Sequence, residues 1–208
     1  MTRPRKGNLY TLVFAACVGL VCASALTAAH SLLAPWQDAN AKARHIRLVL
    51  MALRVPGAET ASPRSAADLY AAKIRQTRRA GVTLYNYMEG AKLVGVAIPF
   101  SGRGYSAPIE GFIGMEPDLK TLRAMVVTYQ AETPGLGGQV GSVAFLEQFQ
   151  GKHVDGLRLV RHGALADNEV DAITGATYTS QRFQAILDKT IVDVQALRSR
   201  PEEPDDAR

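Results

Sequence analysis

Four hydroxyl side chains gather in the stretch DAITGATYTS, residues 171–180. They belong to Thr174, Thr177, Thr179 and Ser180. Gly175 and Ala176 carry little side-chain bulk, so the Thr177 hydroxyl is expected to be accessible. A predicted helix begins just beyond it, and the free amides and dipole of a helix N-terminus favour a bound phosphate. The alternative is a polar turn in which Thr179 or Ser180 caps that helix, although neither is followed three residues later by Glu or Gln.

A second loop that could do chemistry is ETPGLGG, residues 132–138. Pro134 fixes its own φ and Gly135 tolerates a positive φ, so the pair predicts a type II turn. The glycines leave a backbone that a flat or anionic ligand can approach, with Glu132 as a hydrogen-bond acceptor at the entrance. An ordinary glycine-rich hairpin turn is the alternative. A phosphate loop of the NTPase type is excluded, because no Lys-Ser or Lys-Thr pair follows the glycines.

Other kinds of site are not indicated by the pattern. The serines lack a G-x-S-x-G motif, which argues against a serine hydrolase. The histidines have neither HExxH spacing nor a partner motif, so no metal site is predicted. They are His30, His45, His153 and His162. Both cysteines, Cys17 and Cys22, lie in the apolar N-terminal segment, which leaves no thiol for a disulfide in the rest of the chain.

A single membrane anchor is predicted in residues 1–37. Three basic residues come first and are followed by a stretch without Asp, Glu, Lys or Arg from Gly7 through Gln37. Within it, Leu9 to Leu33 supplies the roughly twenty apolar residues that span a bilayer as a helix. Trp36 then stands where an interfacial aromatic anchor is expected. The alternative is a signal peptide cleaved after the small residues ASA at 23–25.

The basic residues of the N-terminal flank are Arg3, Arg5 and Lys6. By the positive-inside rule they predict a cytoplasmic N-terminus, with everything after Trp36 on the opposite side of the membrane. The chain has a net charge of +5, of which this flank supplies three, so the rest is close to neutral. That balance argues against a nucleic-acid partner.

The exported part reads as an α+β domain with a curved antiparallel or mixed sheet flanked by helices. Residues 38–64 are predicted as a stalk helix and linker, residues 65–198 as the domain and residues 199–208 as a disordered tail. Ser65 is expected to cap a helix over residues 66–80. Apolar runs predict strands, two more helical patterns follow, and a further strand lies between them. The strands are 82–88, 92–100, 109–115, 122–130 and 156–161, and the helices are 143–151 and 180–199.

The two loops together resemble the FMN-binding domain of bacterial membrane redox complexes. The stretch DAITGAT is similar to that family's flavinylation motif, and ETPGLGG is similar to its second signature, about forty residues earlier. The stretches GRGYSAPIEGFIGMEPD and FLEQFQGK fall in the expected order. Within the family, GRGYS and ETPGLGGQV are most similar to the NqrC-like subunits of the sodium-translocating NADH:quinone oxidoreductase, and next to the RnfG-like subunits of the related Rnf complex.

The resemblance implies an electron carrier with covalent FMN. A flavin transferase would join the FMN phosphate to Thr177, and Asp171 would serve recognition by that enzyme. The other residues implied in cofactor binding are Glu132, Thr133, Gly135, Leu136, Gly137, Thr174, Gly175 and Ala176. The implied partners are the other membrane subunits of the complex, in the bacterial inner membrane. Two alternatives stay open, a membrane-anchored binding or assembly protein without a redox cofactor and a free exported flavoprotein.

Overall fold

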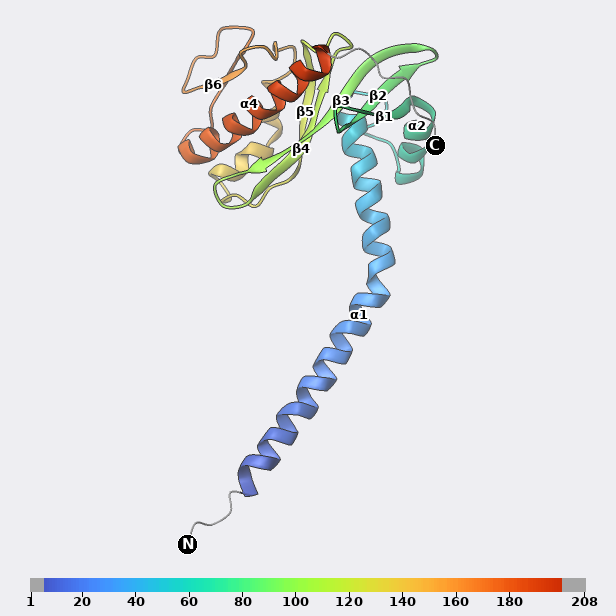
Figure 1. Ribbon diagram of the computed structural model, residues 1–208, viewed down its shortest axis with the longest axis vertical. Coiled ribbons are helices and arrows are strands. Elements are labelled where there is room, and N and C mark those ends of the chain that lie inside the picture. Colours follow the sequence, from blue (N-terminus) through green and yellow to red (C-terminus); the bar gives the residue numbers. More distant parts are fainter. Residues whose placement is uncertain (1–5, 200–208) are drawn as a thin grey trace. The chain divides into compact units, whose positions relative to one another are not determined.

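The computed structural model describes residues 6–199 of the chain (Figure 1). The predicted N-terminal flank up to residue 5 and the tail from residue 200 lie outside the described residues. Contacts divide the chain into two units, Met1–Lys42 and Ala43–Arg208. The expected boundary between stalk and domain was 64–65, whereas the structure places the last turns of the first helix in the same unit as the sheet.

The first helix, α1 (Lys6–Ala52), is 47 residues long and contains Pro35. Its segment Leu9–Ala52 is long and apolar enough to cross a membrane, with a best-window mean hydropathy of 2.3 and no burial of that window inside the protein. Side chains there are exposed, including Leu9, Leu20 and Trp36. The predicted anchor and stalk helices are therefore one continuous helix.

Five antiparallel strands form the main sheet in the order β1-β2-β3-β4-β5. They are β1 (Ile74–Arg79), β2 (Val82–Glu89), β3 (Lys92–Arg103), β4 (Pro108–Met115) and β5 (Leu122–Tyr129). The last four confirm the predicted strands. The predicted helix over residues 66–80 is wrong in its second half, which is β1.

The error over residues 66–80 has a local cause. Helix α2 (Pro63–Lys73) ends where β1 begins, and the side chain of Ser62, not Ser65, accepts the capping hydrogen bond, from Ser65 N. Ala80 and Gly81 both have positive φ, 50° and 80°. This two-residue turn suits a hairpin, so pairing with β2 overrides the helical propensity of the segment.

The remaining elements follow β5. They are η1 (Gly137–Gly141), α3 (Val143–Glu147), β6 (Arg158–Val160), β7 (Glu169–Asp171) and α4 (Thr177–Ser199). Strands β6 and β7 pair in parallel in a small second sheet. The fold is α+β with an antiparallel main sheet, as predicted, and the predicted strand over 156–161 and helices over 143–151 and 180–199 are present.

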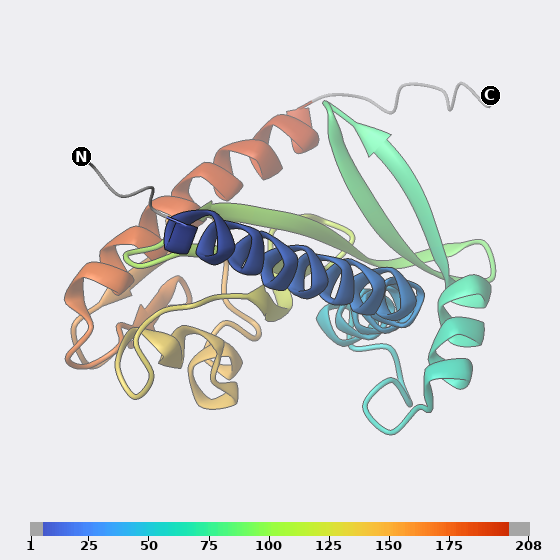
Figure 2. The ribbon, with the colours of Figure 1, turned by 90° about the horizontal axis from the view of Figure 1, so that it is seen from below.

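Two hydrophobic cores lie on opposite faces of the main sheet. In β3, Val96, Ile98 and Phe100 face the larger core, while Ala97 belongs to the smaller one. All six positions predicted for the buried face of the last helix are in the larger core: Phe183, Ile186, Leu187, Ile191, Val194 and Leu197. The far end of α4 reaches the β1–β2 hairpin (Figure 2), where Arg79 Nη2 donates to the Leu197 carbonyl at 3.2 Å.

Candidate functional site

The four hydroxyls of the 171–180 stretch have different environments. Thr179 and Ser180 are buried, and both are committed to hydrogen bonds within the protein. The Thr179 hydroxyl donates to Glu132 Oε2 at 2.7 Å, and the Ser180 Oγ accepts from the Ile173 N–H at 3.2 Å. Thr174 and Thr177 are exposed. These last two are therefore the hydroxyls open to a reactant.

The start of α4 corrects the capping prediction. The helix begins at Thr177, so Thr179 and Ser180 lie inside its first turn and neither is the N-cap. Gly175 has a φ of 77°, which turns the chain sharply before the helix. A residue with a side chain would be strained there, and this explains the glycine. Thr177 is thus presented at the first helical position, directly after a tight turn.

Glu132 is the buried centre of the site and is only 5% exposed. Its Oε1 accepts from the backbone N–H groups of Ser106, at 2.8 Å, and Ala107, at 3.2 Å. With Thr179 on Oε2, the carboxylate joins the β3–β4 turn, the loop after β5 and the start of α4. Both oxygens are engaged by protein donors, so the expected acceptor at the loop entrance serves to hold three segments together.

The ionisation of Glu132 follows from these contacts. Burial raises the pKa of its carboxyl group, because the charged form loses solvation. Hydrogen bonds from the Thr179 hydroxyl and from the backbone of Ser106, Ala107 and Tyr105 stabilise the carboxylate and outweigh burial. The net pKa is therefore below its ordinary value, and the site contains a fixed negative charge near neutral pH.

Two glycines allow the backbone to approach this carboxylate. A Cβ added at Gly137 would lie 2.4 Å from Thr179 Oγ1 and 3.0 Å from Glu132 Oε2. A Cβ at Gly104 would lie 2.6 Å from Glu132 Oε1. These distances are shorter than a real Cβ contact, so both positions require glycine. The bare backbone at Gly137 is filled by protein atoms, whereas a Cβ at Gly135 would meet open space.

The two predicted loops lie next to each other. Thr133 O accepts from Leu136 N at 3.2 Å and Gly135 has a φ of 76°, which fits the predicted turn. Leu136 is 47% exposed, and its Cδ2 lies 3.4 Å from the position of a Cβ at Gly175. Loops some forty residues apart in the sequence therefore meet at the start of α4.

An exposed aromatic pair borders the same region. Tyr105 and Tyr178 stack with ring centroids 5.4 Å apart and an interplanar angle of 19°. Both rings remain largely exposed. Tyr105 belongs to the turn held by Glu132, and Tyr178 is the neighbour of Thr177. The stack thus links the β3–β4 turn to α4 on the surface of the site.

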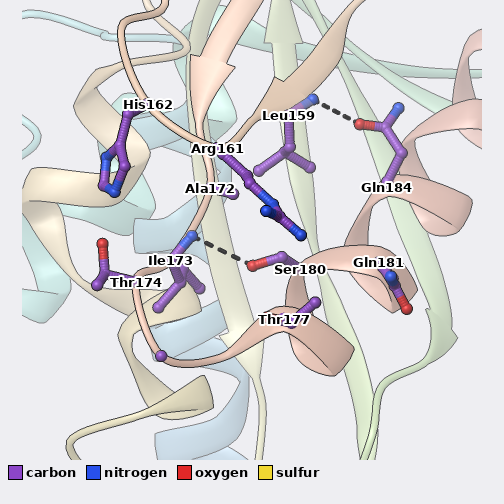
Figure 3. Close-up of a pocket in the computed structure, with 11 residues that line it drawn as sticks. Leu159, Arg161, His162, Ala172, Ile173, Thr174, Thr177, Ser180, Gln181 and Gln184 are labelled. Carbon is purple, nitrogen blue, oxygen red and sulfur yellow. Dashed lines mark hydrogen bonds between the residues drawn. The ribbon is translucent and has the colours of Figure 1, made fainter.

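A pocket of about 430 Å³ opens on the other side of Thr177 (Figure 3). Its lining comes from β6, the loop after it, the segment after β7 and the first two turns of α4. The lining residues are Leu159, Arg161, His162, Ala172, Ile173, Thr174, Gly175, Thr177, Ser180, Gln181 and Gln184. Thr174, Gly175 and Thr177 were predicted site residues. The other eight were not, and the parallel pairing of β6 with β7 is what brings Arg161 and His162 here.

Asp171 does not line the pocket. Its Oδ1 accepts from the Ala164 N–H at 3.0 Å, and its own N–H donates to Gln148 Oε1 at 3.0 Å. The carboxylate therefore holds the end of the β6–β7 connection that carries Arg161 and His162. Recognition of Asp171 by an attaching enzyme stays a prediction, beside this observed structural contact.

Comparison with known proteins gives a family for this arrangement. Residues 104–192 match the family model described as FMN-binding domain. The NqrC subunit of the Na(+)-translocating NADH-quinone reductase of Vibrio anguillarum is 34% identical over 131 residues, which are 59% of this chain and 51% of that protein. The same subunit of Neisseria meningitidis is 37% identical over 103 residues, 46% of this chain and 40% of that protein.

A solved structure has the same fold. The crystal structure of NqrC from Shewanella oneidensis superposes with a TM-score of 0.63 at 23% identity, covering 75% of this chain and 99% of that one. The chain spans about half the length of the relatives that match it in sequence. The matched segment begins at Gly104 and includes both loops, Glu132 and Thr177. Residues 104–192 therefore belong to the FMN-binding domain family, as the two loop motifs indicated.

Proposed function

We propose that this chain is a membrane-anchored electron-transfer subunit that carries FMN as a phosphoester on Thr177. The complex would be of the Na+-translocating NADH:quinone oxidoreductase type, whose NqrC subunit is similar to this chain over residues that include both loops. The chain is then one redox subunit and not a complete enzyme. An Rnf-type complex is the alternative setting for the same carrier.

The observation that carries this proposal is the division of labour among the hydroxyls. Thr179 and Ser180 are buried and hydrogen-bonded within the protein. Thr177 is exposed, lines the pocket and follows the tight turn at Gly175. It is also the last Thr of the motif that resembles a flavinylation site. An attaching enzyme can reach this hydroxyl without unfolding the start of α4.

Attachment at Thr177 requires an activated donor. The hydroxyl loses its proton and its oxygen forms a bond to the phosphorus of the flavin nucleotide. A bond from that phosphorus to a leaving group must break, and the anhydride of a flavin dinucleotide supplies one, with the adenosine monophosphate half leaving. No redox change accompanies this transfer. The donor and the transferase that binds it are partners of the maturing chain.

The residues at the site fit a tethered flavin. FMN, when bound, supplies the redox chemistry, and the protein contributes position and electrostatics. Thr174, Gly175 and Ala176 shape the loop before the attachment point. The loop at Thr133, Gly135 and Leu136 offers an exposed face beside it, while Glu132 and Gly137 lie beneath and keep that loop in place. These assignments include both the pocket and the glycine loop as the surroundings of the cofactor.

Covalent attachment suits a domain outside the cytoplasm. The basic flank at Arg3, Arg5 and Lys6 favours a cytoplasmic N-terminus, with α1 as an uncleaved anchor. The domain after it would then lie on the periplasmic or extracytoplasmic side of the bacterial inner membrane. A tethered cofactor cannot be lost by diffusion there, and the anchor keeps it beside the other membrane subunits.

In-gel fluorescence tests the attachment. The full chain, expressed with a flavin transferase and run under denaturing conditions, should give a fluorescent band under ultraviolet light. Thr177→Ala should abolish the band. Thr177→Ser should keep it, because a hydroxyl is retained, and Thr174→Ala should still give a band. A band of full intensity in Thr177→Ala, or none in the wild-type chain, contradicts the proposal.

A further inference from the structure

We propose that the pocket beside Thr177 is a binding site for the phosphate group of the nucleotide, with Arg161 as its cation and His162 as a second donor. This inference rests on the proposed function, because the phosphate is the one that would be esterified to Thr177. It adds two residues to the site that neither loop motif contains.

The charge of the pocket points to an anion. Arg161 and His162 line it, and no Asp or Glu does. Arg123, Arg158 and Arg198 are each paired with a carboxylate. Within residues 6–199, Arg161 has no such partner. A pocket with one unpaired guanidinium and no acid favours a negatively charged group, and the planar fork of donors on Arg matches phosphate oxygens.

The two basic side chains are held at the pocket from both ends of their segment. On one side, Leu159 N donates to Gln184 Oε1 at 2.6 Å, and Gln184 Nε2 donates to the Leu157 carbonyl at 3.1 Å. On the other side, the Ala164 N–H donates to Asp171 Oδ1. The segment between these contacts is therefore anchored to α4 and to the end of β7, although its side chains are exposed.

Figure 3 shows how the walls face each other. Arg161 extends from the segment after β6 toward the first turn of α4, and His162 lies beside Thr174. Thr177, Gln181 and Gln184 follow at the spacing of four and three residues that places side chains on one face of a helix. A group esterified to Thr177 would enter the pocket between this face and Arg161.

The size and floor of the pocket agree with a nucleotide phosphate. A volume of about 430 Å³ exceeds what a lone phosphate fills, so there is room for the attached ribityl chain. Leu159, Ala172 and Ile173 supply an apolar floor, with the charged and amide side chains around it. The commitment is to the phosphate ester of the tethered flavin nucleotide, with the cation opposite the hydroxyl that would bear it.

Binding of free flavins to the unloaded full chain tests the pocket. Protein purified in detergent from cells without the transferase is titrated with FMN and with riboflavin, which lacks the phosphate, and flavin fluorescence is followed. The wild-type chain should bind FMN about three- to fivefold more tightly, the size expected for one exposed charge pair. Arg161→Gln should lose most of this preference without changing the affinity for riboflavin.

Arg182→Gln is the matched control. It removes the same charge from the first turns of α4, but Arg182 is exposed and does not line the pocket. It should keep the preference for FMN. Equal or undetectable binding of the two flavins by the wild-type chain overturns the inference. So does a preference that survives Arg161→Gln or is lost equally in Arg182→Gln.

The loaded protein provides the second measurement and separates the two proposals. The ³¹P resonance of the Thr177 ester should move in Arg161→Gln and stay in place in Arg182→Gln. A resonance unchanged by Arg161→Gln overturns the contact with the tethered phosphate. If the wild-type chain gives a fluorescent band while Arg161 has no effect, the pocket inference alone fails. If FMN is preferred through Arg161 but no band forms, covalent attachment fails instead.

Discussion

The two faces of the main sheet are covered in different ways. On one face α4 lays a row of apolar side chains over β3 and β4, and the site is built from the start of that helix and the loops around it. On the other face the end of α1 and the segment after it close the core, with Val49, Leu50 and Leu53 fully buried. One face thus carries the chemistry, and the other carries the connection to the apolar helix.

The closeness of packing differs between the faces as well. At Gly114 in β4, an added Cβ would lie 1.8 Å from the Ala52 carbonyl oxygen, so helix end and sheet touch backbone to backbone. On the α4 face the contacts are between side chains, as in the cluster of Phe183 with Phe100, Phe145 and Phe149. The difference teaches that the α1 end belongs to the folded domain, while remaining apart from the site.

The largest expected effect comes from removing a core side chain on the α4 face. Phe183→Ala deletes a fully buried ring and should lower the free energy of unfolding by about 4 kcal/mol. Leu50→Ala on the opposite face should lower it by about 3 kcal/mol. Urea unfolding of the full chain in detergent measures both. Only Phe183→Ala should also reduce flavin attachment per folded molecule, and equal losses would mean that the faces are not independent.

A glycine substitution tests the backbone contact of the α1 face. Gly114→Ala places a methyl group against the Ala52 carbonyl and should destabilise the fold by about 3 kcal/mol, because neither backbone can move freely. Gly141→Ala is the control, since the nearest atom to its added Cβ is 3.8 Å away. It should change stability by no more than about 0.5 kcal/mol. A tolerated Gly114→Ala would show that α1 separates readily from the sheet.

The buried carboxylate gives the site face a pH dependence that the other face lacks. Glu132→Gln should lower stability by about 1.5 kcal/mol at neutral pH, since charge-assisted hydrogen bonds become neutral ones. The pKa of Glu132 is lowered in the folded state from an ordinary value of 4.5. Its stabilisation is therefore complete above that pH and is lost as the pH falls below it.

Unfolding curves from pH 7 down to pH 3 test this assignment of Glu132. The difference in stability between the wild-type chain and Glu132→Gln should shrink as the solution becomes more acidic. Glu110→Gln, at an exposed position, should show no comparable trend. A constant difference across the range would assign the effect to shape rather than to charge.

The smallest expected effect concerns an ion pair near the pocket. Arg158 Nη2 lies 2.5 Å from Glu169 Oε1, but the arginine side chain is 63% exposed. Arg158→Gln should therefore cost no more than about 0.5 kcal/mol, and less in high salt. Thermal unfolding at two salt concentrations is the measurement. A larger loss would indicate that the β6–β7 pair, and with it the pocket wall, depends on this contact.

Patterns of period and turn chemistry predicted much of the fold. The apolar face of α4 was predicted at all six positions, because a long helix on a sheet repeats its contacts every three or four residues. Strands β2 to β5 followed from runs of apolar and β-branched residues between turns. β1 was missed, since its residues favour a helix alone and become a strand only by pairing with β2.

The candidate site was predicted in its loops but not in its wiring. Thr177 and the glycine loop were found from residue type and order, and the structure brings the two loops together. The role of Glu132 depends on donors from Ser106 and Thr179, which lie 26 and 47 residues away. No local pattern reports such contacts. Arg161 was missed for the same reason, because only tertiary pairing carries its segment to the pocket.

The first strand of the sheet has a consequence for how copies of this domain meet. β1 is at the edge of the main sheet, and its sequence IRQTRR carries three arginines. An unpaired strand is a template on which another sheet can extend. Like charges along that border repel an identical border, so the arginines oppose edge-to-edge aggregation while leaving the strand free to meet an acidic surface.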